Sequence, residues 1–145
     1  MSVHFHGKFS LLLFLAAIVV GLVAIVKEST TMGMMYGVVI LISLVSILWS
    51  YCAKCRCRKG GCVHYFTAKI ANLLPDRKPG KYTLWDNLGL LVPVAVMLII
   101  PQFWLWKNTP LIIVFWTGVV VSVIDLRLFV CCACKNRVCI LNKRT

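Results

Sequence analysis

Residues 9–26 read FSLLLFLAAIVVGLVAIV, a run of apolar and small residues without a single charge. A membrane-spanning helix needs about 20 consecutive, mostly apolar residues, and this run is of that kind. It follows Lys8 near the N-terminus, as the apolar part of a secretory signal peptide would. Lys27 and Glu28, however, stand where such a peptide has its small-residue cleavage site. We therefore expect residues 9–26 to be retained as a transmembrane helix.

Three further runs of the same kind follow, at residues 32–51, 88–106 and 111–130. Of the 145 residues, 61% are hydrophobic, and the mean hydropathy of the chain is +0.90. A soluble domain of this length could not bury that much apolar surface. The sequence therefore predicts an all-α integral membrane protein with four transmembrane helices. Pro93 and Pro101 predict kinks in the third helix.

The basic residues lie almost entirely on one side of the predicted membrane. The connections at residues 27–31 and 107–110 hold one lysine each, and they are so short that the four helices of the single domain 1–145 form two hairpins. The other basic residues outside the helices are Lys8, then Lys54, Arg56, Arg58, Lys59, Lys69, Arg77, Lys78 and Lys81 in the loop 52–86, and Lys135, Arg137, Lys143 and Arg144 in the tail 131–145. Segments rich in Lys and Arg stay on the cytoplasmic side. We expect a multi-pass protein of a plasma, inner or organelle membrane, with both termini, the loop and the tail cytoplasmic.

Within the loop, residues 64–74 have the spacing of a short amphipathic helix. Apolar side chains recur there at i, i+4, i+7 and i+8, at Phe66, Ile70, Leu73 and Leu74. Such a helix either lies in the headgroup region of the cytoplasmic leaflet or packs under neighbouring subunits. The sequence leaves both interpretations open.

All eight cysteines lie in two short runs that directly follow the second and fourth predicted helices. The first run consists of Cys52, Cys55, Cys57 and Cys62, and the second of Cys131, Cys132, Cys134 and Cys139. The pattern Cys-x-Cys-x4-Cys occurs in both, which indicates two halves of similar design. Cytoplasmic thiols are normally kept reduced, so structural disulfides are disfavoured. Each run instead offers four thiolates for a metal.

Four thiolates suit either a [4Fe–4S] cluster or tetrahedral zinc. Structural zinc sites usually take two well-separated ligand pairs, whereas each run here is crowded, as in a ferredoxin loop, although the ferredoxin spacing is not matched. The sequence therefore favours iron–sulfur over zinc, with His64 beside the first run as an extra donor. A third interpretation is S-palmitoylation, because cysteines next to basic residues at the end of a membrane helix are typical acceptors.

Two charged residues, Asp125 and Arg127, fall in the last turns of the fourth run, where charge is costly. Asp125 either serves a proton or ion pathway, or faces the cysteines, or pairs with a basic residue of the loop while Arg127 reaches the headgroups. We favour the pairing, since no other acid lies within a predicted helix. His4 and His6 precede the first helix and are expected to be solvated.

The sequence contains no motif of a catalytic site, which leaves enzymatic activity without support. We expect a small subunit of a membrane redox complex whose cysteine runs bind one or two iron–sulfur clusters and relay electrons. The alternative is a non-catalytic accessory subunit with zinc-bound or palmitoylated cysteines. With a net charge of +12, the expected partners are other membrane subunits, anionic lipids and an acidic soluble electron carrier, and no nucleic acid.

Overall fold

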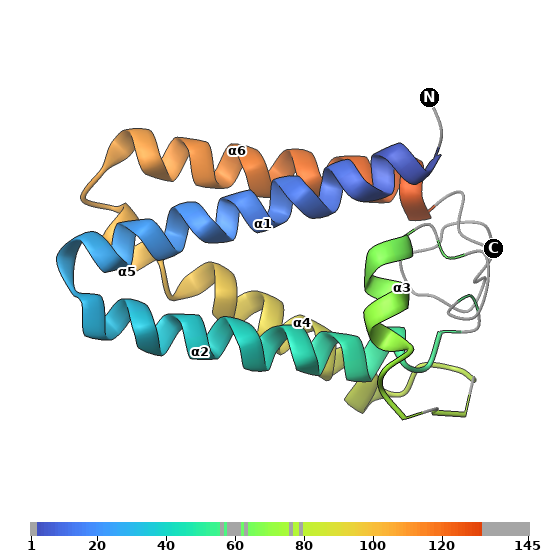
Figure 1. The fold of residues 1–145 in the computed structure, drawn as a ribbon. Helices are drawn as coiled ribbons and strands as arrows, with labels where there is room; N and C mark the ends of the chain where they lie inside the picture. The colour runs from blue at the N-terminus through green and yellow to red at the C-terminus, as the bar shows by residue number, and fades with distance from the viewer. Residues whose placement is uncertain are drawn as a thin grey trace.

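The computed structural model describes residues 3–55, 57, 62, 64–75, 77–78 and 80–131. These residues form helices and no strand. The elements are α1 (Val3–Glu28), α2 (Thr30–Ile47) with the π-helical turn η1 (Leu48–Cys52), α3 (Tyr65–Ala71), α4 (Leu84–Ile99), α5 (Gln102–Leu105), and α6 (Thr109–Asp125) with the π-helical turn η3 (Leu126–Cys131) (Figure 1).

Four helical segments are long and apolar enough to cross a membrane, which confirms the predicted number of spans. They are His4–Glu28, Thr30–Cys52, Leu84–Leu105 and Thr109–Cys131, with 25, 23, 22 and 23 residues. At about 1.5 Å per residue, each reaches across a hydrocarbon core of about 30 Å. Large apolar side chains, including Leu12, Met34, Ile42 and Ile113, are exposed on the outside of the bundle. This fold is compatible with a multi-pass membrane protein whose outer surface meets lipid.

The four spans pack as two pairs. α1 packs most extensively against α6 and also contacts α2, whereas α2 packs against α4. The connections from α1 to α2 and from α5 to α6 lie at one end, which we call the short-loop end (Figure 1). The N-terminus, α3, η1 and η3 lie at the other, which we call the α3 end. The α1/α6 and α2/α4 pairs separate toward the α3 end, where α3 lies across the axes of the spans (Figure 1).

Small residues on α1 allow the close approach of the helices around it. A Cβ atom added to Gly21 would lie 3.0 Å from Cβ of Pro101 and 3.3 Å from the ring of Phe115. Small residues at helix contacts let backbones approach closely, which is how helices gain packing energy in a membrane. The buried core cluster that results consists of Ala17, Ala24, Leu105, Phe115 and Val119.

Pro101 ends the regular part of the third span. A proline has no N–H group, so the carbonyl of Met97, four residues earlier, loses its helical hydrogen bond. The hydroxyl of Tyr36 on α2 replaces it and donates to the Met97 oxygen at 2.7 Å in a buried position. The carbonyl that loses its donor in one helix therefore accepts a hydrogen bond from a side chain of the neighbouring helix.

The carbonyl of the next residue, Leu98, also accepts a hydrogen bond from a side chain. Gln102 Nε2 donates to the oxygen of Leu98 at 2.7 Å. The Oε1 atom of Gln102 accepts a hydrogen bond of 3.1 Å from the indole N–H of Trp116 on α6. These bonds tie the interrupted end of the third span to α6, as the bond from Tyr36 ties it to α2.

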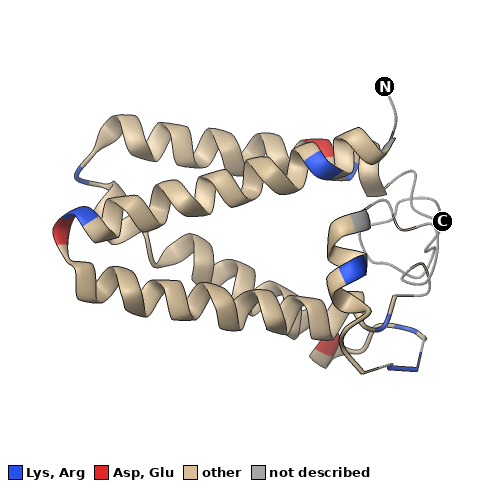
Figure 2. Ribbon diagram, in the orientation of Figure 1, with Lys and Arg blue, Asp and Glu red and all other residues tan. Residues whose placement is uncertain are grey.

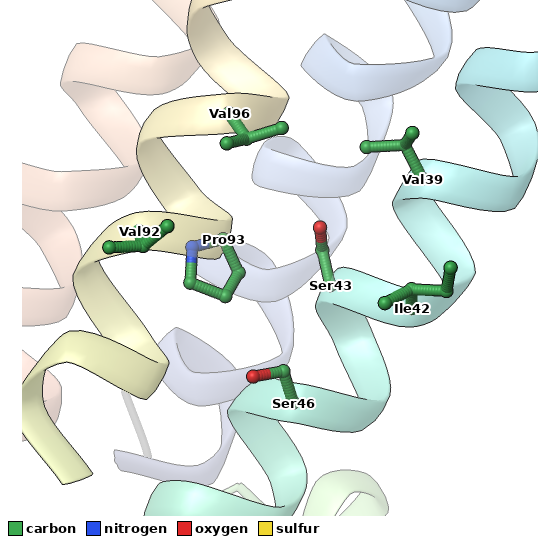
Figure 3. Close-up of a pocket in the computed structure, with 7 residues that line it drawn as sticks. All are labelled: Val39, Ile42, Ser43, Ser46, Val92, Pro93 and Val96. Atoms are coloured by element: carbon green, nitrogen blue, oxygen red, sulfur yellow. The ribbon is translucent and has the colours of Figure 1, made fainter. Parts of the chain in front are cut away.

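Pro93 removes a second backbone donor from α4, and Ser46 on α2 supplies the replacement. The Ser46 hydroxyl donates to the carbonyl of Gly89, four residues before Pro93, at 3.2 Å. A groove of about 240 Å³ lies beside this contact, between α2 and α4. Its lining consists of Val39, Ile42, Ser43, Ser46, Val92, Pro93 and Val96 (Figure 3).

We expect the change Tyr36→Phe to lower the free energy of unfolding by about 1–2 kcal/mol, because the buried Met97 oxygen is left without a donor. The change Pro101→Ala restores the backbone N–H, so Tyr36→Phe should cost much less in that background. Unfolding in mixed detergent micelles, followed by circular dichroism, measures all four proteins of this cycle. An equal cost of Tyr36→Phe in both backgrounds would show that the hydroxyl does not replace the missing amide.

Candidate functional site

The α3 end holds most of the titratable side chains of the described chain. Lysines, arginines and acids are absent from the middle of the described spans and lie at the two ends of the bundle (Figure 2). The short-loop end has only Lys27, Glu28 and Lys107, of which Lys107 Nζ and Glu28 Oε2 form an exposed ion pair at 2.7 Å. The described cysteines, the histidines and two buried carboxylates lie at the α3 end. Candidate chemistry is therefore found there.

Both cysteine runs begin at the α3 end. Cys52 is the last residue of η1 and Cys131 the last residue of η3. Cys57 and Cys131 are buried, and Cys52, Cys55 and Cys62 are partly buried. The other three predicted ligands, Cys132, Cys134 and Cys139, lie outside the described residues.

The first run by itself does not fit a four-thiolate centre in this structure. All four of its cysteines are described, yet nowhere in the described chain do three or more His, Cys, Asp or Glu side chains gather closely enough to hold a metal. The predicted metal centre thus stays a prediction.

His64 joins the loop to the first span. It caps the N-terminus of α3, and its Nδ1 atom lies 3.1 Å from the carbonyl oxygen of Gly7 on α1. Because a carbonyl can only accept, Nδ1 carries the hydrogen and Nε2 keeps its lone pair. Burial lowers the pKa of His64 below its ordinary value of 6.5, although the bond to Gly7 opposes this shift. A neutral imidazole oriented in this way is the form that binds metals.

A buried carboxylate and an imidazole join the first and last spans. Nδ1 of His6 on α1 lies 2.7 Å from Oδ1 of Asp125 on α6, and the imidazole stacks on the ring of Phe129 with the ring centroids 4.3 Å apart. Asp125 is 8% exposed. The expectation that Asp125 would pair with a basic residue of the loop is wrong, and so is the expectation that His6 is solvated. The reason is that α1 begins before residue 9 and brings His6 alongside α6.

Other buried oxygens lie at the contact between α1 and α6. The Ser122 hydroxyl of α6 donates to the backbone oxygen of Ser10 on α1 at 2.8 Å, which sets the register of the two antiparallel helices. Oγ of Ser10 and Oδ2 of Asp125 are buried and have no hydrogen-bond partner among the described residues. Among the contacts of the described chain, His6 Nδ1 is a hydrogen-bond partner of the Asp125 carboxyl group.

A second carboxylate, Asp86, fastens the loop to the start of α4. Its side chain is 2% exposed and binds Lys54 Nζ at 2.6 Å and Arg77 Nη2 at 3.0 Å. Thr83 and Asp86 also form a capping box, in which each side chain accepts from the other's backbone N–H. This group was not predicted from the sequence, although the Thr-x-x-Asp spacing before an apolar run is the local signal of such a cap.

Fold and site together describe a small helical protein with four segments that could span a membrane, whose described thiols and buried carboxyl groups lie at one end. Comparison with protein-family models, with curated proteins and with solved structures found no match for this chain. What the protein does is therefore proposed from the residues of the α3 end.

We expect the change His6→Ala to lower the free energy of unfolding by about 3–5 kcal/mol, because it leaves a buried carboxylate without its partner. The double variant His6→Ala, Asp125→Asn removes the charge as well and should recover much of that loss. The matched control is His4→Ala, since His4 is an exposed histidine on the same helix. Unfolding in mixed micelles is the measurement. Equal stabilities of the His6→Ala and His4→Ala variants would contradict the buried pair.

Proposed function

We propose that the protein is a small membrane subunit of a redox complex that binds an iron–sulfur centre at its α3 end and relays electrons. The single observation that carries this proposal is that η1 and η3 end at the same end of the bundle, with Cys52 as the last residue of η1 and Cys131 as the last residue of η3 (Figure 1). Eight thiols on two segments are more than helix packing requires, whereas thiolates are the usual ligands of iron–sulfur clusters.

The ligands of this centre are drawn from both runs. The four cysteines of the first run do not form a group of three or more ligand side chains in the described chain. His64 attaches the loop to α1 through Gly7, and α1 packs against η3. The segment that carries the first run is thereby joined to the helix that leads into the second. We therefore expect one shared centre rather than one centre in each run.

The α3 end faces the cytoplasm, or the equivalent side of an organelle membrane, in this proposal. Support comes from the distribution of positive charge: of 16 lysines and arginines, only Lys27 and Lys107 belong to the short-loop end. Insertion places the more basic segments on the non-translocated side. The basic α3 end would then meet acidic partners, such as a soluble electron carrier, and other subunits would pack on the apolar sides of the spans.

Purification without oxygen, followed by iron and sulfide analysis with visible and EPR spectra, tests the proposed centre. We expect stoichiometric iron and sulfide, a broad absorption band of thiolate-bound iron, and an EPR signal in one oxidation state. A colourless protein without iron would contradict the redox function.

Two cysteine variants test whether the centre is shared. Cys57→Ser and Cys131→Ser each change one run, and with a shared centre each should lose nearly all of the iron. With one centre in each run, each variant would instead retain about half. The matched control is Met35→Ala, on the exposed side of α2, which should bind as much iron as the unchanged protein.

The second candidate is a non-catalytic accessory subunit whose cysteines bind zinc or carry palmitoyl groups. The observation that favours it is the position of Cys52 and Cys131 at the ends of η1 and η3, because cysteines at the end of a membrane helix beside basic residues are typical acceptors of palmitoyl groups. The same purification separates these cases, since zinc without colour indicates a structural metal. Thioesters cleaved by hydroxylamine, in a protein without metal, indicate lipidation.

A further inference from the structure

The surface around α3 turns its large apolar side chains outward. α3 packs on η1 through Ala68 and Ala71, which are buried. Phe66 and Leu73, in contrast, are 62% and 86% exposed. α3 lies across the axes of the spans, at the level where α4 begins (Figure 1). Its exposed apolar side chains therefore lie near the boundary of the membrane-spanning part.

The first turn of α4, at the same end of the bundle, also exposes large apolar side chains. Leu84 and Trp85 are 72% and 80% exposed, and they begin the third span, Leu84–Leu105. Tryptophan prefers the boundary between the hydrocarbon core and the headgroups, because its ring is apolar and its N–H is polar. A water-exposed patch of this kind would be costly, whereas a bilayer surface accommodates it.

The same segments of the chain also contain exposed lysines. Lys69 on α3 and Lys78 and Lys81 in the connection to α4 are exposed, and no ion pair within the described chain involves them. Asp86 is buried and already bound by Lys54 and Arg77. The acid at position 76 lies outside the described residues. The three lysines are thus exposed, on α3 and in the connection that leads to Leu84 and Trp85.

We propose that these residues form a binding surface for anionic phospholipids of the adjacent leaflet. This interfacial surface consists of Phe66, Leu73, Leu84 and Trp85 together with Lys69, Lys78 and Lys81. The ammonium groups bind headgroup phosphates, and the apolar side chains enter the boundary between headgroups and acyl chains. An acidic soluble protein would match the lysines, but it would not reach Leu84 and Trp85, which belong to a membrane span.

The test compares phosphatidylglycerol with phosphatidylcholine, which differ in charge and can carry the same acyl chains. Native mass spectrometry of the full chain in detergent, with both lipids added in competition, gives the ratio of their affinities. The variant carries Lys69→Gln, Lys78→Gln and Lys81→Gln, and the matched control carries Lys27→Gln and Lys107→Gln at the short-loop end. This proposal does not depend on the redox function, because iron content is not its readout.

We expect the unchanged protein and the control to prefer phosphatidylglycerol. The triple variant should lose this preference by about fivefold for each lysine, and by up to about a hundredfold in all. Trp85→Ala should lower the retention of both lipids alike, because the ring contacts the chain region. An unchanged preference in the triple variant, or an equal loss in the control, would overturn the proposal. The proposal would also be overturned if the three lysines bound an added acidic protein but gave no preference between the two lipids.

Discussion

Inside a lipid-facing bundle, every backbone polar group has to find its hydrogen bond within the chain, since the hydrocarbon offers none. This constraint applies at two positions of the third span, because Pro93 and Pro101 each leave one carbonyl without its helical donor. Both missing donors come from α2, through Ser46 and Tyr36. This requirement explains why α4 packs on α2. α6, in turn, pairs with the small-residue side of α1.

The number of spans was predictable from the sequence, because length and apolarity are local properties that do not depend on packing. The pairing of the spans was not predictable. The spans are apolar on all sides, so no polar stripe marks which side meets another helix. The third span begins at Leu84 rather than at residue 88, because the capping box of Thr83 and Asp86 starts α4 earlier than hydropathy indicates. A search for caps would have found that boundary.

Part of the candidate site was likewise predictable from the sequence, and part was not. That Cys52 and Cys131, where the two cysteine runs begin, lie at one end of the bundle followed from counting spans, because an even number of crossings returns the chain to the same end. The contact between His6 and Asp125 could not be derived in this way, since the two residues are 119 positions apart. One signal pointed toward it. An acid in a span requires a compensating partner, and a histidine just before the first span was a candidate once that helix was allowed to start earlier.

The described acids are all compensated from within the chain, and this determines what the α3 end presents to its surroundings. Asp125 is bound by His6, Asp86 by Lys54 and Arg77, and Glu28 at the opposite end by Lys107. Lys69, Lys78 and Lys81 at the α3 end have no such acid among the described residues, so another species can supply negative charge to them. Headgroup phosphates and an acidic partner both meet that requirement. Only lipids, however, would also meet Leu84 and Trp85, the exposed side chains that begin the third span, so a lipid surface matches these lysines better than a soluble protein does.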